Sequence, residues 1–303
     1  MSAVEIEHVT KTFGPFTAVD DLGLTVPENS IYGFIGPNGS GKTTTLRMIM
    51  RILLPDRGTI RVLGDESWHA ANDRVAYLPE ERGLYKQMKV REVLRFYAEL
   101  KGCRDSGAAI DAWLKRLELS DWADKKVQAL SKGMAQKVQF IATIIAKPEL
   151  VLLDEPFSGL DPINTEVLRD AVLDLKKEGA TVVFSTHDMS VAERMCDFIF
   201  MIHKGKKVLD GTLESIQDAY GNDTLRVRLE NDGAAFENLP GVAKVTDFGR
   251  LKELRLERSA DSQQVLAALM ARGSVRHFEL TRPSLQDIFV RIAGPVGEEN
   301  HHA

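Results

Sequence analysis

The sequence has little cysteine and no long hydrophobic run. Two cysteines in 303 residues, Cys103 and Cys196, stand far apart and in no metal-binding spacing, which is typical of a protein from a reducing compartment such as the cytosol. The most apolar segment, residues 138–146, is far shorter than the roughly 20 residues that a membrane-spanning helix needs. Any role at a membrane is therefore expected to be peripheral.

The sequence also has fewer basic than acidic residues. The chain carries 39 Lys and Arg against 44 Asp and Glu, a formal net charge of -5 at pH 7. A chain without a general positive field lacks the electrostatic footprint of a protein that coats nucleic acid. The first residues, MSAVEIE, contain neither a basic leader nor an apolar stretch, so we expect no signal peptide. At 44% hydrophobic and 27% charged, the composition is that of an ordinary globular protein.

Hydrophobic patterning predicts an α/β first domain. Residues 4–13 and 19–27 alternate in part, as strands do, whereas 31–35, 150–153 and 181–185 are continuous apolar runs typical of strands buried on both faces. Further strands are expected at 58–63 and 75–78, helices at 42–52 and 191–196, a helical insertion at about 82–148, and a hairpin at 198–209. Strands interrupted by helices favour a sheet covered on its faces by helices.

A smaller α+β domain is expected after residue 211. We therefore divide the chain into a first domain over 1–211 and an accessory domain over 212–303, whose tail, 294–303, is polar and expected to be disordered. Its predicted strands are 224–230 and 251–257, and its predicted helices are 262–271 and 284–292. The sequence leaves open whether this domain regulates, senses a ligand or braces a dimer, with a mild preference for bracing.

The strongest local motif lies between a predicted strand and a predicted helix. Residues 36–43 read GPNGSGKT, which is the Walker A spacing of two glycines, Lys and Thr. Backbone N–H groups in such a loop converge on an anion, and the following helix N-terminus adds partial positive charge. Lys42 is expected to reach the β- and γ-phosphates and Thr43 to bind Mg²⁺. The nucleotide-binding residues predicted from this motif are Gly36, Pro37, Asn38, Gly39, Ser40, Gly41, Lys42, Thr43 and Thr44. A glycine-rich turn without a ligand is disfavoured by the flanking strand and helix.

Polar residues follow two of the buried strands. Asp154 and Glu155 come directly after 150–153, and His187 comes soon after 181–185. The carboxyl ends of parallel strands form the ligand edge of an α/β sheet, so Asp154 is a candidate for holding Mg²⁺ and Glu155 for polarising the water that attacks the γ-phosphate. A solvated turn is the alternative for the carboxylates, and the Walker A loop favours catalysis. For His187 taken alone, a polar cap is the more frequent interpretation, and contact with the γ-phosphate or the water is the functional one.

Taken in order over residues 4–211, these motifs resemble the ATP-binding cassette (ABC) family of transporter ATPases. Residues 130–134, LSKGM, are similar to the family signature, and 158–161, SGLD, are similar to its D-loop. The resemblance implies a P-loop, RecA-like core with an antiparallel β subdomain and a helical arm. For the site it implies nucleotide contacts for Ser131 and Gly133, and catalytic roles for Asp161 and for His187 as switch histidine. It also implies stacking of Phe13 on adenine.

Each local match has a structural alternative. The LSKGM run also suits a helix N-cap and turn, and Phe13 also suits the core. Together with their order and spacing, the motifs imply that two cassettes clamp two ATP molecules head to tail. Ser131 and Gly133 of one chain would then face the phosphates held by Lys42 of the other, so a second copy of the cassette is an expected partner.

Two positions depart from the family pattern. Glu80 follows the strand-like run YLP where the family usually has Gln, and Met134 stands where the signature usually has Gln. Glu80 is a candidate direct ligand of Mg²⁺. Because it brings negative charge toward the γ-phosphate, slower or differently coupled hydrolysis is expected. Met134 leaves Ser131 and Gly133 in place.

The predicted function is ATP hydrolysis that powers substrate export through separate integral membrane subunits. Residues 83–90, GLYKQMKV, together with the small C-terminal domain resemble ATPase subunits of sodium- and drug-exporting systems. Leu84, Tyr85 and Met88 are expected either to face the membrane partner or to pack within the arm. We place the protein in the cytoplasm at the inner face of the cell membrane, with ATP and Mg²⁺ as cofactors and no nucleic-acid partner. The alternative is a cytosolic ABC ATPase acting on nucleic acid or ribosomes, which usually shows two cassettes, a long coiled coil or a zinc hook.

Overall fold

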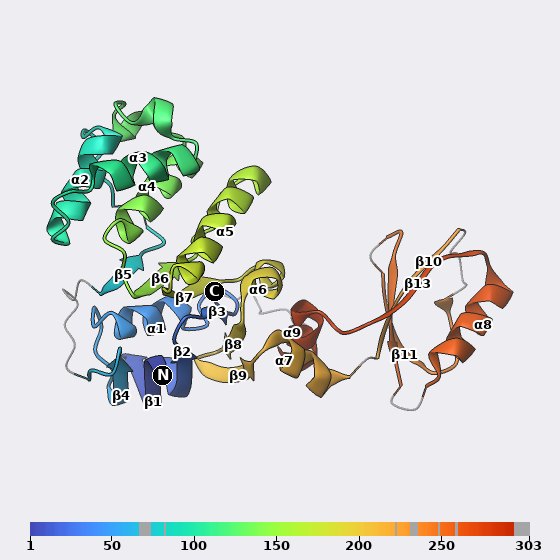
Figure 1. Cartoon of the computed structure of the whole chain (residues 1–303). Coiled ribbons are helices and arrows are strands. Elements are labelled where there is room, and N and C mark those ends of the chain that lie inside the picture. The colour runs from blue at the N-terminus through green and yellow to red at the C-terminus, as the bar shows by residue number, and fades with distance from the viewer. Residues whose placement is uncertain are drawn as a thin grey trace, which may run out of the picture. The chain divides into compact units, whose positions relative to one another are not determined.

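The computed structural model describes residues 1–66, 74–81, 83–221, 223–230, 236–247, 249–257 and 260–293. The chain forms two compact units, Met1–Thr212 and Leu213–Ala303 (Figure 1). The tail that the sequence predicts to be disordered, 294–303, lies outside the described residues, as does position 82 at the start of the predicted helical insertion. Within the described ranges, no helix has both the length and the apolar character needed to cross a bilayer.

A six-stranded sheet forms the centre of the first unit, in the order β5-β6-β7-β3-β8-β9. Its strands are β3 (Ile31–Ile35), β5 (Val75–Leu78), β6 (Leu150–Asp154), β7 (Thr181–Thr186), β8 (Phe198–His203) and β9 (Lys206–Gly211). Neighbouring strands are parallel except for the β8–β9 hairpin. Every residue of β3, β6 and β7 is buried, which accounts for their continuous apolar sequences. The carboxyl ends of β3, β6 and β7 therefore meet at one edge of the sheet.

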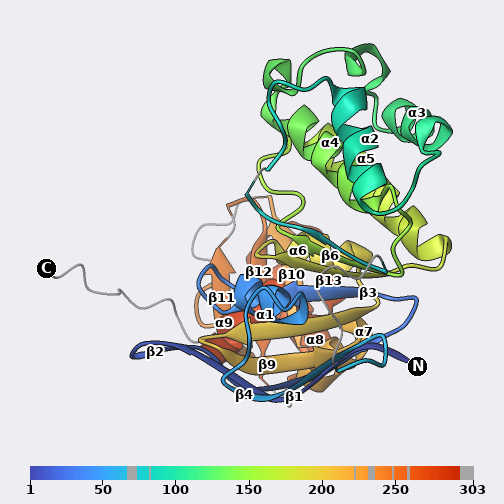
Figure 2. The same cartoon turned by 90° about the vertical axis from the view of Figure 1, so that its left-hand side faces the viewer.

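A second, antiparallel sheet of three strands packs on one face of the central sheet (Figure 2). It pairs β2 (Phe16–Pro27) with β1 (Ser2–Phe13) and β1 with β4 (Arg57–Val62), and its core is shared with helix α1 (Lys42–Ile49). The helix predicted over 42–52 is shorter than expected, because Met50 is its C-cap and Arg51 adopts φ 52°, in the left-handed region. Alternate residues of β6 contact opposite layers, since Leu152 packs with α1 and Leu153 with the helices of the other face.

Helices cover the other face of the central sheet and form an arm between β5 and β6. The arm contains α2 (Val90–Leu100), α3 (Gly107–Arg116), two short 3₁₀ turns (Ser120–Trp122 and Val127–Ala129) and α4 (Lys132–Ile144). Helices α5 (Pro162–Lys177) and α6 (Met189–Met195) pack with the arm in one hydrophobic core. Helix α6 begins two residues before the predicted 191–196, because the Asp188 carboxylate accepts hydrogen bonds from the amides of Ser190 and Val191. The predicted α/β core with an antiparallel β subdomain and a helical arm is confirmed.

The second unit is a four-stranded antiparallel sheet with helices, in the order β11-β12-β10-β13. Its elements are α7 (Leu213–Tyr220), β10 (Thr224–Leu229), β11 (Val242–Asp247), β12 (Lys252–Leu256), α8 (Ser262–Arg272), β13 (Val275–Thr281) and α9 (Leu285–Ala293). Strands β10 and β12 lie at the centre and alternate buried with exposed residues, as their sequences predict. Sequence patterning missed α7 and the edge strands β11 and β13. The two edge strands contain no buried residue and so show no hydrophobic alternation.

A candidate nucleotide site at the edge of the central sheet

The loop 36–43 joins β3 to α1 at the ligand edge of the sheet, and it requires glycine at two positions. A Cβ atom on Gly36 would lie 2.2 Å from the backbone oxygen of Ile202, and one on Gly41 would lie 2.5 Å from that of Ala18. Both glycines also adopt positive φ, 155° and 110°. The close approach of β8 and β2 therefore shapes the loop, and its backbone N–H groups precede the N-terminus of α1, where an anion is favoured.

Lys42 is the first residue of α1, and its ammonium group is buried inside the loop. The Nζ atom donates hydrogen bonds to the backbone oxygens of Gly36, at 2.8 Å, and Pro37, at 3.2 Å. It also lies 3.4 Å from Oε1 of Glu155. A compact cation is thus held at the centre of the loop by carbonyl groups, which are the groups that a phosphate oxygen would replace.

Asp154 ends β6 and is fully buried, with three side-chain donors around its carboxylate. Oδ1 accepts from the hydroxyls of Thr43, at 3.1 Å, and Ser185, at 2.5 Å, and Oδ2 accepts from the phenol of Tyr77, at 3.2 Å. Sequence reasoning assigned Thr43 and Asp154 but missed Ser185 and Tyr77. These two come from the strands that flank β6, and only the strand order places them beside Asp154.

The oxygen atoms of Thr43 and Asp154 suit a magnesium ion. Mg²⁺ is bound in proteins by one or two hard oxygen ligands together with substrate phosphates and water, not by a complete protein cage. Accordingly, in the ranges that the structure describes, no group of three or more His, Cys, Asp or Glu side chains is arranged to hold a metal. The adjacent hydroxyl and carboxylate therefore fit the cation that the sequence predicts, and Glu80 lines a cavity that Thr43 also lines.

Glu155 follows β6 in a left-handed conformation, with φ 48°, which turns its side chain from the sheet toward the loop. Its backbone amide donates to Ser185, at 3.0 Å, and its Oε2 lies 3.0 Å from Nδ1 of His187. The Oε1 atom is buried and makes no hydrogen bond within the described part of the chain. A buried acceptor 3.4 Å from Lys42 and without a hydrogen-bond donor is suited to take one from a water molecule.

A cavity of about 290 Å³ adjoins the loop, and eight of the predicted site residues line it. Its lining consists of Phe16, Ala18, Asn38, Gly39, Gly41, Lys42, Thr43, Thr44, Glu80 and Glu155. Pro37 and Ser40 lie in the same loop. Phe13 pairs with Phe16 across the β1–β2 hairpin and is 46% exposed, but Phe16 is the aromatic residue in the lining. Stacking of Phe13 on adenine stays a prediction.

Three of the predicted residues lie at the starts of helices outside this cavity. Ser131 caps α4, where its Oγ accepts from the amide of Met134 at 3.2 Å, and Gly133 lies in the first turn of the same helix. Asp161 caps α5 in a similar way, and hydrogen bonds from the backbone and side chain of Asn164 lower the pKa of its carboxyl group. The N-cap that the LSKGM sequence allowed is thus present. Within one chain, these residues do not reach the phosphate loop cavity.

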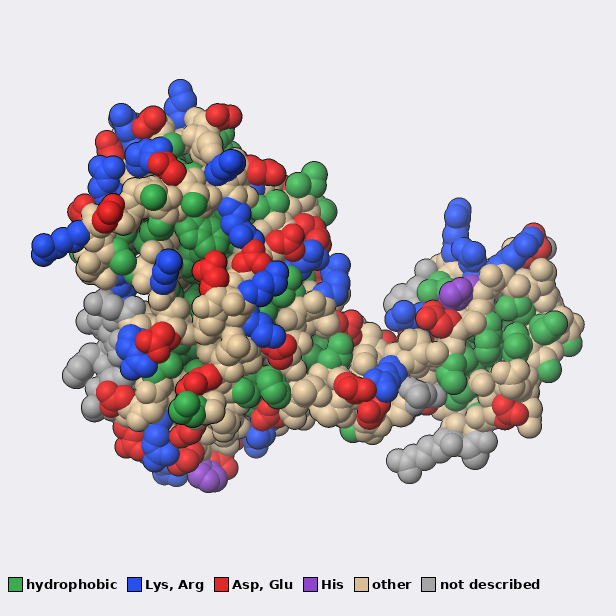
Figure 3. All heavy atoms as spheres, in the orientation of Figure 1, with side chains coloured by type: hydrophobic (Ala, Val, Ile, Leu, Met, Phe, Trp, Pro, Cys, Tyr) green, Lys and Arg blue, Asp and Glu red, His purple; other side chains and the backbone are tan. Residues whose placement is uncertain are grey.

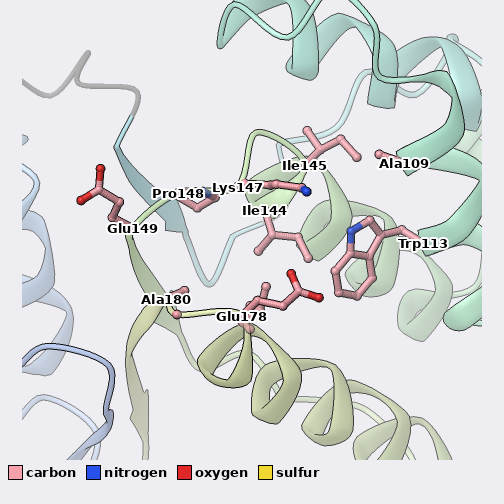
Figure 4. Close-up of a pocket in the computed structure, with 11 residues that line it drawn as sticks. Ala109, Trp113, Ile144, Ile145, Lys147, Pro148, Glu149, Glu178 and Ala180 are labelled. Carbon is pink, nitrogen blue, oxygen red and sulfur yellow. The ribbon is translucent and has the colours of Figure 1, made fainter.

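A second cavity, of about 450 Å³, lies between α3, α5 and the C-terminal end of α4 (Figure 4). Trp113, Ile144, Lys147 and Glu178 form part of its lining. Hydrophobic side chains also gather between the arm and α5 on the face of the first unit seen in Figure 3, beside charged groups of both signs. None of the predicted site residues lines this cavity.

We expect Glu80→Gln to retain ATP binding and to change turnover. Glu80 lines the phosphate loop cavity, and the substitution removes one negative charge near the position of the γ-phosphate. The rate of phosphate release and its dependence on Mg²⁺ concentration, measured at saturating ATP, should both shift from those of the wild type. An unchanged rate with an unchanged Mg²⁺ dependence would exclude contact between Glu80 and the cation.

Three protein-family models match parts of the chain. A family model described as ABC transporter matches residues 19–158, and one described as ATP-binding protein DrrA1-3-like, C-terminal domain, matches 211–293. A third model, described as AAA domain, putative AbiEii toxin, Type IV TA system, matches residues 124–193, within the first unit. Together, the first two models span most of both units.

Two curated relatives align with nearly the whole chain. The uncharacterized ABC transporter ATP-binding protein YhaQ of Bacillus subtilis (strain 168) is 42% identical over 97% of this chain and 99% of its own length. The daunorubicin resistance ATP-binding protein DrrA3 of Streptomyces coeruleorubidus is 31% identical over 97% and 96%. A solved structure titled as an ATP binding subunit of an ABC transporter superposes with a TM-score of 0.67, at 29% identity, over 73% of this chain and 94% of that one.

Proposed function

The chain belongs to the ABC transporter ATP-binding proteins, and we propose that two copies associate head to tail and hydrolyse magnesium-ATP. The hydrolysis drives export through separate membrane subunits. ATP hydrolysis coupled to transport is the activity of this family, whose ATP-binding subunits work with membrane permease partners. The observation that carries the proposal is the meeting of Lys42, Asp154 and Glu155 at one edge of the sheet. Export is supported by a relative named Nod factor export ATP-binding protein I, of Paraburkholderia xenovorans (strain LB400), which is 32% identical over 97% of this chain.

The residues of this chain supply binding, orientation and proton acceptance. Lys42 and the loop amides hold the β- and γ-phosphates, and Thr43 with Asp154 holds the cation. When bound, Mg²⁺ neutralises negative charge on the phosphates. Glu155 polarises the attacking water through Oε1, and His187 orients the other carboxylate oxygen from 3.0 Å. Phosphoryl transfer requires mainly positioning and electrostatic stabilisation, which these side chains provide.

The exposed positions of Ser131 and Asp161 support a site completed by a second copy. Both residues cap helices of more than eight residues, and both stand outside the cavity around Lys42 of their own chain. The N-terminus of α4, with Ser131 and Gly133, offers backbone N–H groups and partial positive charge to an anion. In a head-to-tail dimer, this terminus would face the γ-phosphate bound by the Lys42 loop of the other chain.

An apolar groove in the first unit supports the proposal that a membrane subunit binds this chain. It encloses about 520 Å³ between the end of β5 and helices α2 and α4, and Leu84, Tyr97 and Leu100 contribute to its walls. Leu84 and Met88 pack in part against the core, whereas Leu100 is 63% exposed. Exposed apolar side chains around a groove are typical of a protein interface. We propose that an apolar segment of the membrane subunit binds there, which would place the chain at the inner face of the membrane.

We expect Leu100→Glu to separate the chain from its membrane partner. In the complex, the new carboxylate at position 100 would be buried against apolar side chains of the partner. The amount of membrane subunit recovered with the purified protein should therefore fall about tenfold. ATP binding by the isolated chain should stay unchanged, because Leu100 is absent from the phosphate loop cavity. The matched control is Met270→Glu on α8, a position of equal exposure at 64%. Equal recovery for the two variants would contradict a partner in this groove.

A further inference from the structure

The phenol of Tyr77 reaches from the apolar groove into the nucleotide site. Tyr77 lies on β5, next to β6, and its ring forms part of the groove wall. Its hydroxyl donates to Oδ2 of Asp154 at 3.2 Å. In the sequence, Tyr77 is only the first residue of the run YLP before Glu80, and a tyrosine inside a short apolar strand is ordinarily a packing residue.

The hydrogen bonds of Asp154 divide between its two carboxylate oxygens. Ser185 and Thr43 both donate to Oδ1, and Tyr77 is the donor to Oδ2 among the described side-chain contacts. A carboxylate rotates easily about its last bond, so one anchored oxygen leaves the plane of the group undetermined. A Thr43 hydroxyl that binds the cation no longer has to serve Asp154, and Ser185 and Tyr77 then hold one oxygen each.

The hydroxyl of Tyr77 is suited to donate rather than accept toward Asp154. A carboxylate only accepts hydrogen bonds, and an ordinary phenol is protonated at neutral pH and can therefore donate to it. The hydroxyl of Tyr77 also makes a hydrogen bond with Arg47. Arg47 lies in the last turn of α1, so the phenol links this helix to the end of β6.

We propose that Tyr77 is a positioning residue, whose phenol fixes the plane of the Asp154 carboxylate in the orientation that binds the nucleotide-associated magnesium ion. The inference rests on the proposed role of Asp154 as a magnesium ligand. It concerns the metal rather than the nucleotide, because Tyr77 lines the groove and is absent from the lining of the phosphate loop cavity. Tyr77 therefore acts on the site through Asp154.

The test is Tyr77→Phe in the full chain, which keeps the ring in the groove wall and removes only the hydroxyl. A fluorescent ATP analogue is titrated first without metal, in EDTA, and then at fixed concentration with increasing Mg²⁺. We expect the Mg²⁺ concentration at half-maximal enhancement of binding to rise about tenfold, as for the loss of one hydrogen bond to a charged group. Metal-free binding should equal that of the wild type, since the phosphate loop is untouched.

Tyr97→Phe is the matched control. Tyr97 lines the same groove, and its hydroxyl donates to the backbone oxygen of Gly83 at 3.3 Å instead of to Asp154. This variant should leave both the metal-free affinity and the Mg²⁺ midpoint unchanged. An unshifted midpoint in Tyr77→Phe, an equal shift in Tyr97→Phe, or a loss of metal-free binding in Tyr77→Phe would each overturn the positioning role. If the wild type itself shows no effect of Mg²⁺ on ATP binding, the proposed function of Asp154 fails instead.

Discussion

Glu155→Gln should lower the rate of ATP hydrolysis by about 10² to 10⁴-fold, the range associated with the loss of a positioned general base. The glutamine has the same shape, but its amide cannot take a proton from the attacking water. Oε1 of Glu155 is the buried acceptor without a hydrogen-bond donor, and His187 holds the other oxygen. Because Lys42 and the loop amides are unchanged, ATP affinity should stay within about twofold of the wild type, far less than the tenfold that 1.4 kcal/mol would produce.

Phosphate release and binding of a fluorescent ATP analogue measure these two effects separately. Glu178→Gln is the matched control, because Glu178 is an exposed C-cap residue of α5 and lines the second cavity instead of the nucleotide site. It should hydrolyse ATP at the rate of the wild type. If Glu155→Gln keeps half of the wild-type rate, water activation belongs to another residue and the role assigned to Glu155 is wrong.

Lys42→Ala should weaken ATP binding by about 10 to 100-fold, as for the loss of a charge-assisted hydrogen bond to phosphate. The ammonium group is buried and is held by the backbone oxygens of Gly36 and Pro37, so no other described cation of the loop can replace it. Its removal also leaves the buried carboxylate of Glu155 without the cation that lies 3.4 Å away. Both effects disfavour a bound triphosphate.

The measurement for Lys42→Ala is the dissociation constant for ATP with and without Mg²⁺, with the melting temperature as a check on folding. Lys147→Ala is the control, because Lys147 lies in an exposed turn at the second cavity. This control should bind ATP as the wild type does. An affinity for Lys42→Ala that equals that of the control would remove Lys42 from the binding site.

In the first unit, the elements and site residues that depend on consecutive residues of the chain could be predicted from the sequence. The buried strands β3, β6 and β7 are continuous apolar runs, and the phosphate loop has a fixed spacing between its glycines and Lys42. Each of these signals is contained within a few consecutive residues. The same holds for Asp154 and Glu155, which follow a buried strand directly and therefore stand at the ligand edge.

Features that depend on the order of strands were not predictable in this way. Ser185 and Tyr77 contact Asp154 because β7 and β5 flank β6, although the two residues lie 31 and 77 positions from Asp154 along the chain. Likewise, the choice between Phe13 and Phe16 for the cavity lining depends on the hairpin that pairs them. In the second unit, the edge strands lack buried residues and so leave no periodic signal.

In our account, Ser131 and Gly133 contact the nucleotide that a second chain binds. They lie at the start of α4 and outside the cavity that contains Lys42, so a single chain presents a nucleotide site and a separate helix N-terminus. Our account requires these two surfaces to meet across a dimer with ATP between them. Replacing Ser131 by a bulky cation, as in Ser131→Arg, should then block closure without affecting the nucleotide site of its own chain.

The most direct test is the molar mass of Glu155→Gln in solution with magnesium-ATP, determined by light scattering and compared with that of Ser131→Arg/Glu155→Gln. The head-to-tail account predicts the mass of two chains for the first protein, one chain for the second, and ATP bound to both. A single-chain mass for Glu155→Gln with ATP bound, or an equal dimer in the presence of Ser131→Arg, would contradict a site shared between two copies.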